Sequence, residues 1–149
     1  AYPILKHFAM PFTIFLTTQF ISSKNSTFMS WDQILEFNSE PLVTFGAHSK
    51  SHASLKALTN QDKIDEIIGS KKLIEEKLQE QVKYFAYPGG GFDNICLETV
   101  KDNYRLGFKD RTNGDDDLDK RKVARLSIDS RHNRLKNFLI ELANAKFLD

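Results

Sequence analysis

Short β-branched or aromatic runs alternate with longer amphipathic segments along nearly the whole chain. The apolar runs are typical of buried strands and fall at residues 11–16, 42–45, 84–87, 106–108 and 123–128. Helical periodicity predicts helices over residues 30–37, 60–81, 94–104 and 135–145. Polar loops are expected at residues 22–27 and 113–120. This alternation indicates parallel βαβ units, and we expect an α/β fold with a single domain over residues 1–149.

The helix predicted between Asn60 and Gln81 has the clearest pattern. Five aliphatic side chains recur there at helical spacing: Ile64, Ile67, Ile68, Ile74 and Leu78. Ser30 is a residue type that caps helices, and it precedes a shorter helix that Pro41 ends. Trp31 lies at helical spacing from the apolar residues of that helix, so we expect it in the core rather than at a sugar-binding surface.

The composition excludes several classes of protein. The chain has 149 residues, of which 21 are basic and 20 acidic, and its net charge is +1. No nucleic-acid partner is expected, because such a partner requires a basic patch. Cys96 is the only cysteine, so the chain has neither an internal disulfide nor a cysteine-rich metal site. No apolar run approaches the roughly 20 residues that cross a bilayer, so no transmembrane segment is expected.

Residues 1–8 have the pattern of the end of an amphipathic helix whose N-cap is missing. We therefore expect a natural N-terminal piece to precede Ala1. His7, at the end of this helix, is expected at the surface. A sheet that lacks an edge strand can pair with a second copy of itself, so a homo-oligomer is among the expected states.

Two histidines follow the predicted strand 42–45, in the segment Gly46-Ala47-His48-Ser49-Lys50-Ser51-His52. Active sites collect in loops at the carboxyl ends of parallel strands. On a helical turn, His48 and His52 would face the same way, and both imidazoles would reach one ion. The alternative is two surface histidines that are close by chance, and the spacing alone does not separate these interpretations.

The second feature is a strand that ends in a proline and three glycines, Phe85-Ala86-Tyr87-Pro88-Gly89-Gly90-Gly91. Glycines leave backbone N–H groups with little steric cover, and such groups can stabilise an oxyanion. A tight turn without a catalytic role is the commoner meaning of a Pro-Gly cluster.

In their order and spacing, these segments resemble the polysaccharide deacetylases of carbohydrate esterase family 4, the NodB homology domain. The segment from His48 to His52 is similar to the metal-binding H-[ST]-x-x-H motif, and residues 85–90 resemble the third motif in its FAYP form. Residues 3–16 resemble the segment after the first motif. The strand and turn that follow the third motif in the family are similar to the segment here that contains Gly107, Phe108, Thr112 and Gly114. The resemblance implies an irregular (β/α) barrel, here with its N-terminal strand missing.

The resemblance also implies a reaction, the hydrolysis of N- or O-acetyl groups on an acetylated polysaccharide or oligosaccharide. His48, His52 and an Asp would bind a divalent metal, most often Zn, with Co, Ni or Mn as alternatives. A second Asp would act as general base on the attacking water.

Four further residues gain roles from the resemblance alone. The backbone N–H of Gly89 would donate to the oxyanion, and Tyr87 and Pro88 would bind substrate. The general acid of the family is a late histidine, for which His132 is the candidate here. An exposed position at a helix cap is the competing interpretation for His132.

The sequence departs from the family pattern at several points. The first motif, Thr-Phe-Asp-Asp-Gly, supplies the base and the third metal ligand, and it is not in the chain; we expect it upstream of Ala1. Ala86 stands where many members have an Arg, and Gly89 stands where a Tyr is usual. No Leu-Leu-His motif surrounds His132. A partial metal site with weak or absent activity is therefore the expectation for this chain.

Other interpretations stay open. The acidic residues Asp115, Asp116, Asp117 and Asp119 form a substitute metal site or, as is usual for such runs, a solvated loop. The protein is alternatively a degenerate deacetylase that binds glycan without cleaving it. A third interpretation is that the chain is an unrelated α/β interaction module, whose histidines are incidental and have no specific affinity for zinc. Resemblance alone favours the cell envelope or secretion, and it leaves the sugar and the choice between amide and ester open.

Overall fold

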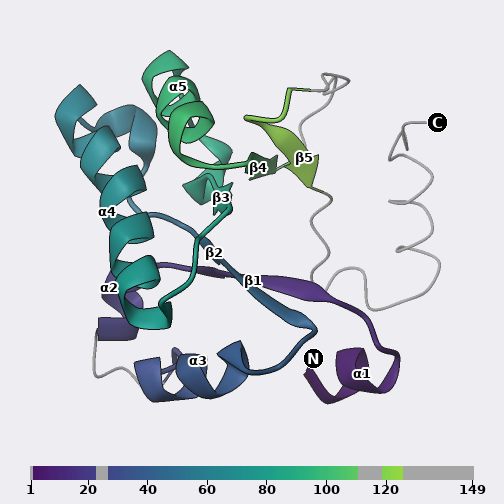
Figure 1. Ribbon diagram of the computed structural model, residues 1–149. Coiled ribbons are helices and arrows are strands. Elements are labelled where there is room, and N and C mark those ends of the chain that lie inside the picture. The colour runs from purple at the N-terminus through teal and green to yellow at the C-terminus, as the bar shows by residue number, and fades with distance from the viewer. Residues whose placement is uncertain (1, 23–26, 111–118, 126–149) are drawn as a thin grey trace.

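The computed structural model describes residues 2–22, 27–110 and 119–125, which form an α/β fold with a five-stranded sheet (Figure 1). The strands are β1 (Phe12–Leu16), β2 (Val43–Ala47), β3 (Tyr84–Ala86), β4 (Leu106–Asp110) and β5 (Val123–Arg125). The helices are α1 (Tyr2–His7), α2 (Thr18–Ser22), α3 (Trp31–Asn38), α4 (Asn60–Leu78) and α5 (Asn94–Asn103). Two 3₁₀ turns, η1 (Leu55–Ala57) and η2 (Pro88–Gly90), follow β2 and β3.

All neighbouring strands of this sheet are parallel, and their order in space, β1-β2-β3-β4-β5, is their order in the sequence. The longest register runs from Phe12 beside Val43 to Leu16 beside Ala47. In Figure 1, α3, α4 and α5 lie on the same side of the sheet. A sheet that grows in one direction with its helices on one side has the arrangement of a (β/α) barrel wall rather than that of a doubly wound sheet.

A contact between Phe15 of β1 and Phe108 of β4 indicates that the sheet is strongly curved. Two strands separate β1 from β4, so on a flat sheet they would lie about 14 Å apart. The two ring centroids are nevertheless 5.6 Å apart, edge to face. Gly46 of β2 leaves room for this contact, because a Cβ there would lie 2.6 Å from Cε1 of Phe15. The described strands therefore have the curvature expected of a barrel.

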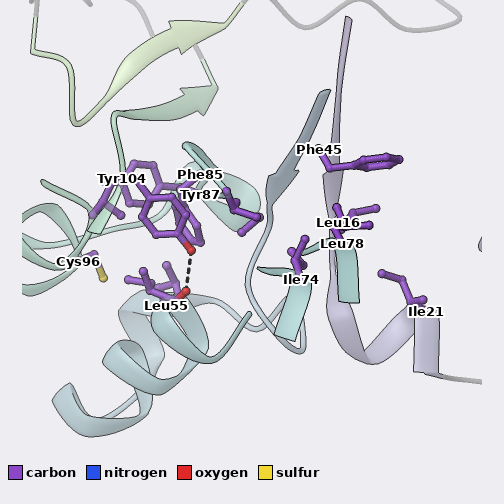
Figure 2. Packing of buried hydrophobic residues seen from close by; sticks show 14 of the residues in the cluster. Leu16, Ile21, Phe45, Leu55, Ile74, Leu78, Phe85, Tyr87, Cys96 and Tyr104 are labelled. Carbon is purple, nitrogen blue, oxygen red and sulfur yellow. Dashed lines mark hydrogen bonds between the residues drawn. The ribbon is translucent and has the colours of Figure 1, made fainter. Parts of the chain in front are cut away.

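The core lies between the sheet and α4. Ile67 and Ile74 of α4 are fully buried and belong to one hydrophobic cluster with Phe85 of β3. Figure 2 shows the rings of Phe85, Tyr87 and Tyr104 gathered at one part of this core. The Tyr104 hydroxyl donates to the Ile67 carbonyl at 2.8 Å, and burial raises the pKa of this tyrosine. The aromatic side chains thus fix α4 to the strands that carry the site.

Capping side chains set where the main helices begin. Ser30 accepts from the backbone N–H of Gln33, and the Gln33 side chain accepts from the Ser30 N–H, which is a complete capping box. Thr59 caps α4 by accepting from Asp62 N, and Asp93 caps α5 by accepting from Cys96 N. Each cap satisfies a backbone donor that has no partner inside its helix.

The predicted elements within the described residues are confirmed, with some differences. The strand predicted at 42–45 runs from Val43 to Ala47, and α4 ends at Leu78 because Gln79 adopts a left-handed backbone with φ of 55°. The strand predicted as buried at 11–16 has a buried side chain only at Leu16. The short helix α2 was not predicted, since five residues are too few to carry a periodic pattern.

Trp31 is half-buried and packs against the core cluster, as expected. Several predictions lie outside the described residues. They are the end of the strand at 126–128, the helix at 135–145 and most of the acidic loop at 113–118.

Candidate functional site

His48 directly follows β2, and the loop it opens lies at the carboxyl ends of β1 and β2. Three backbone hydrogen bonds join this loop to the end of β1 and the residues after it: His48 N to Leu16 O (2.9 Å), Thr18 N to Ser49 O (3.3 Å) and Gln19 N to Lys50 O (2.8 Å). The Thr17 hydroxyl also donates to the His48 carbonyl at 3.1 Å. The unpredicted helix α2 therefore begins where it supports the histidine loop.

The rings of His48 and His52 lie together, with centroids 4.8 Å apart and planes at 75°. The predicted helical turn is wrong, because residues 48–52 form a loop in which Ser49 and His52 both have φ of 63°. This left-handed conformation costs a residue with a Cβ about 1–2 kcal/mol. Two such residues in a five-residue loop persist only if their surroundings hold them in place.

A hydrogen bond to the backbone fixes the orientation and the tautomer of His48. Its Nδ1 lies 2.7 Å from the carbonyl oxygen of Ala86, at the end of β3. A carbonyl oxygen only accepts, so Nδ1 must carry the proton that it donates. In the neutral imidazole the lone pair then lies on Nε2. Metal-binding histidines commonly use this arrangement, in which a second group orients the ring.

The pair of rings fits a divalent metal in donor chemistry and spacing. Imidazole nitrogens bind zinc at about 2.0–2.1 Å, which puts the centroids of two rings on one tetrahedral ion about 5 Å apart. The measured 4.8 Å agrees with this value. Among the described residues, no group of three His, Cys, Asp or Glu side chains could hold a metal ion. The described part of the chain thus offers two candidate donors, His48 and His52, without a third beside them.

Polar side chains hold the strained loop from within and from α4. The Ser49 hydroxyl is fully buried and accepts from His52 N at 3.0 Å. Glu66 of α4 accepts three hydrogen bonds from the loop, two of them from backbone N–H groups of Lys50 and Ser51. Nothing in the sequence marked Glu66, because a Glu on a helix face usually reads as a solvated residue.

Aromatic rings extend from His52 on the exposed side of the site. The imidazole is nearly parallel to the ring of Phe20, with centroids 6.2 Å apart, and Phe28 stacks on Phe20 at 4.6 Å. His52 itself is exposed, whereas His48 is half-buried. One ring is therefore fixed by the backbone and the other rests against an aromatic neighbour.

The Pro-Gly segment forms the 3₁₀ turn η2 next to the residue that orients His48. Gly89 is exposed and left-handed, with φ of 58°, and a Cβ there would have no atom within 4 Å. Backbone conformation rather than space therefore favours glycine. The hydrogen bond of the turn is donated by Gly90 to the Tyr87 carbonyl, so this bond does not use the Gly89 N–H.

Tyr87 and Pro88, both predicted to bind substrate, are buried instead. The Tyr87 ring packs on Phe92 at 4.6 Å, and its hydroxyl donates to the Arg121 carbonyl at 2.7 Å. Burial raises the pKa of Tyr87, which keeps the hydroxyl protonated and donating. The Tyr87 side chain thus fixes the turn to the core.

Asp119 is the one member of the acidic run that the structure describes. Its carboxylate accepts from the Arg121 guanidinium at 2.7 Å, and this interaction lowers the pKa of the Asp119 carboxyl. The contact gives Asp119 a structural partner. His132 and residues 115–117 lie outside the described part of the chain.

The larger hollows of the described surface lie elsewhere. A cavity of about 810 Å³ lies where α4 ends and β3 begins, and its lining includes Glu75, Lys83 and Arg105. A smaller one of about 240 Å³ adjoins it near Val43 and Tyr84. Both are at the amino ends of the strands, opposite the histidine loop. In (β/α) barrels the active site lies at the carboxyl ends, so neither hollow is a candidate.

Comparison with known proteins bears directly on this site. A family model described as polysaccharide deacetylase matches residues 1–107, which include β1 to β3 and the histidine loop. The chain belongs to the polysaccharide deacetylase family. This membership excludes the unrelated α/β interaction module.

Known members of the family agree with the fold. A putative polysaccharide deacetylase of Bacillus subtilis, YxkH, is 30% identical over 108 residues, which are 72% of this chain and 38% of that protein. The Streptococcus pyogenes deacetylase PplD, solved in complex with acetate, has a TM-score of 0.80 at 22% identity. The similar region covers 94% of this chain and 62% of the PplD chain. The Bacillus cereus polysaccharide deacetylase BC0361 has a TM-score of 0.77 at 20% identity, covering 95% of this chain and 46% of its own.

The chain therefore spans well under half the length of the curated deacetylase that it matches. It is also similar to BA3943 of Bacillus anthracis, described as a pseudoenzyme of carbohydrate esterase family 4, with a TM-score of 0.53 at 23% identity over 67% of this chain and 33% of that one. The helices of the described residues do not combine the length and hydrophobicity of a membrane span.

Proposed function

We propose that this chain, as a single domain over residues 1–149, carries the metal-binding loop of an enzyme that removes acetyl groups from a polysaccharide. Membership of the family supports the reaction class. The observation that carries the proposal is the pairing of His48 with His52, centroids 4.8 Å apart, with His48 oriented by a backbone carbonyl. The substrate is an acetylated polysaccharide or oligosaccharide.

The reaction is a hydrolysis of an amide or an ester. The oxygen of water adds to the acetyl carbonyl carbon, and the bond from that carbon to the sugar nitrogen or oxygen then breaks. The sugar amine or hydroxyl takes up a proton, and acetate is the second product. Two groups are needed besides the metal ligands, a base for the water and an acid for the leaving group.

His48 and His52 would hold a divalent metal, with Zn the first candidate and Co, Ni or Mn as alternatives. A bound ion supplies Lewis acidity, which polarises the acetyl carbonyl and lowers the pKa of the attacking water. His48 would bind through Nε2, because Nδ1 donates to the Ala86 carbonyl. Holding that tautomer before the metal arrives removes one ordering step from binding.

The turn η2 would contribute to the oxyanion. Gly89 lies three residues after Ala86, whose carbonyl contacts His48, so the turn adjoins the histidine pair. The turn's own hydrogen bond leaves out the Gly89 N–H. A rigid N–H donor beside the site is suited to stabilise negative charge as it develops on the acetyl oxygen.

A zinc titration by calorimetry tests the site. Wild-type chain should bind zinc with micromolar affinity, and the His48→Ala, His52→Ala double variant should lose at least about 100-fold. His7→Ala is the matched control, since His7 is exposed at the end of α1 and should not matter. Equal and feeble binding by wild type and double variant would contradict the proposed metal site.

A second function has its own supporting observation. No third metal-binding group accompanies His48 and His52 among the described residues, and BA3943 is a neighbour described as a pseudoenzyme. The chain alone would then bind glycan and release little or no acetate. Acetate release from an acetylated chito-oligosaccharide, measured beside binding of the same oligosaccharide, separates the two functions. Ready release would rule out the degenerate form.

A further inference from the structure

Glu66 is the residue through which α4 holds the histidine loop. Its Oε2 accepts from the backbone N–H groups of Lys50 at 2.8 Å and Ser51 at 2.9 Å. Its Oε1 accepts from the Ser51 hydroxyl at 2.7 Å. One carboxylate thus receives both consecutive N–H groups at the tip of the loop, and charged acceptors form hydrogen bonds about twice as strong as neutral ones.

The position of these contacts in the loop is specific. Lys50 and Ser51 are the two residues between Ser49 and His52, which both have the left-handed φ of 63°. The Ser49 hydroxyl closes the same stretch by accepting from His52 N. The Glu66 carboxylate therefore holds the peptide N–H groups that lie between Ser49 and His52. These contacts help to keep both residues in their unfavourable left-handed conformation.

Glu66 is also well anchored on its own side. It lies inside the 19-residue helix α4, next to Ile67, which is fully buried in the core. A half-buried side chain on such a helix moves little relative to the sheet. Glu66 thereby connects the histidine loop to the same hydrophobic core that contains side chains of β2 and β3.

We propose that Glu66 is a positioning residue that sets the separation of His48 and His52 for metal binding. This inference rests on the proposed function of the histidine pair. Without the carboxylate, the loop is free to leave its left-handed conformation, and His52, which no backbone bond to β3 restrains as it does His48, moves away from its partner. The metal must then reorder the loop as it binds, and its affinity falls.

Three variants separate positioning from general stability. Glu66→Ala removes all three acceptors and should weaken zinc binding by about tenfold or more, the range found for groups that orient ligands. Glu66→Gln keeps an amide oxygen for the two N–H groups and an amide donor for the Ser51 hydroxyl, so it should bind within threefold of wild type.

Asp65→Ala is the matched control. Asp65 neighbours Glu66 on α4 and contacts the same loop, but only through the side chain of Lys50, at 2.6 Å, and it is largely exposed. This variant should bind zinc as wild type does. If Glu66→Ala binds within threefold of wild type, or if Asp65→Ala loses as much, the positioning role is wrong.

Amide hydrogen exchange provides a readout that needs no metal. The N–H groups of Lys50 and Ser51 should be protected in the wild type and in Glu66→Gln, and should exchange at least tenfold faster in Glu66→Ala. If wild type binds no zinc, the proposed function fails while the exchange rates still decide whether Glu66 holds the loop. Equal exchange in Glu66→Ala and wild type overturns the inference. Should Glu66→Ala not fold, Glu66→Asp, one methylene shorter, serves in both measurements.

Discussion

The two halves of α4 use their charged residues differently. In the first half, Lys63 and Glu66 contact groups far away in the sequence, the cap of α5 and the histidine loop. In the second half, Lys71 and Glu75 contact each other at 2.8 Å and both contact Val82, just before β3. The first half thus organises the carboxyl ends of the strands, where the metal site is proposed, and the second half closes the connection at the amino ends.

This difference between the two halves bears on where the proposed metal site lies in the fold. A hollow of about 810 Å³ lies beside the second half, yet its lining is mixed in charge and its ion pair is satisfied locally. The first half adjoins a loop with strained backbone and converging side chains. Strain and convergence of polar groups therefore identify the site better than the volume of a cavity does.

The largest effect should come from Asp93→Ala, which removes the partner of a buried lysine. Lys63 has a side chain only 7% exposed and donates to Asp93 at 2.7 Å, with Asn60 at 3.3 Å as its other contact. The loss of this partner and of the α5 cap should destabilise the protein by about 3–4 kcal/mol in urea unfolding.

Lys63→Met tests the reason for that loss. Removal of the lysine leaves a carboxylate that water can reach, so this variant should stay within about 1 kcal/mol of wild type. Equal destabilisation by Lys63→Met and Asp93→Ala would mean that packing, and not an unpaired charge, explains the result.

A smaller effect is expected from Glu75→Ala in the second half of α4. Val82 N loses an acceptor at 2.9 Å, but Lys71 keeps the Val82 carbonyl and lies 4.9 Å from the centroid of the Tyr104 ring. The free energy of unfolding should fall by about 1–2 kcal/mol. Zinc affinity should not change, and a loss of affinity here would break the division between the two halves.

The smallest effect is a dependence of stability on acid pH. The hydrogen bond from Lys63, together with that from Cys96 N, lowers the pKa of Asp93 to about 2. A carboxyl whose folded pKa is depressed stabilises the fold above its unfolded value, about 3.9, and this contribution is lost as pH falls through about 2. The free energy of unfolding, measured by urea titration, should therefore fall between pH 4 and pH 2. The fall should be less than about 1 kcal/mol, because the Asp93 side chain is 38% exposed.

The control for the pH effect is Asp93→Asn. The asparagine retains a capping oxygen for Cys96 N but does not titrate, so the fall in stability over this range should be shallower. The same slope in wild type and variant would assign the pH dependence to other carboxylates, such as Asp119 or Glu40, whose pKa values are also lowered.

Much of this structure follows from local patterns in the sequence. The stripe of isoleucines predicts α4, and the alternation of strands and helices predicts the parallel sheet. The histidine pair is also predicted, because the end of a strand fixes where the next residues must lie. Patterns of this kind depend on neighbours in the sequence, which is why they can be read without the fold.

What the sequence does not reveal depends on contacts between distant segments. Glu66 and the left-handed backbone of Ser49 and His52 leave no periodic pattern. The resemblance of residues 85–90 to a family motif predicts Tyr87 near substrate, yet its ring packs against Phe92 in the core. Each of these outcomes is decided by which surfaces meet after folding, and a linear pattern carries no record of that.

The acceptor that orients His48 is a main-chain carbonyl, and this has a consequence for substitutions at position 86. A substitution at position 86 changes the side chain but leaves that oxygen in place as long as β3 keeps its path. The tautomer of His48 thus depends on the path of β3 rather than on the side chain at position 86. An alanine at position 86 therefore serves this hydrogen bond as well as any other side chain that β3 accepts.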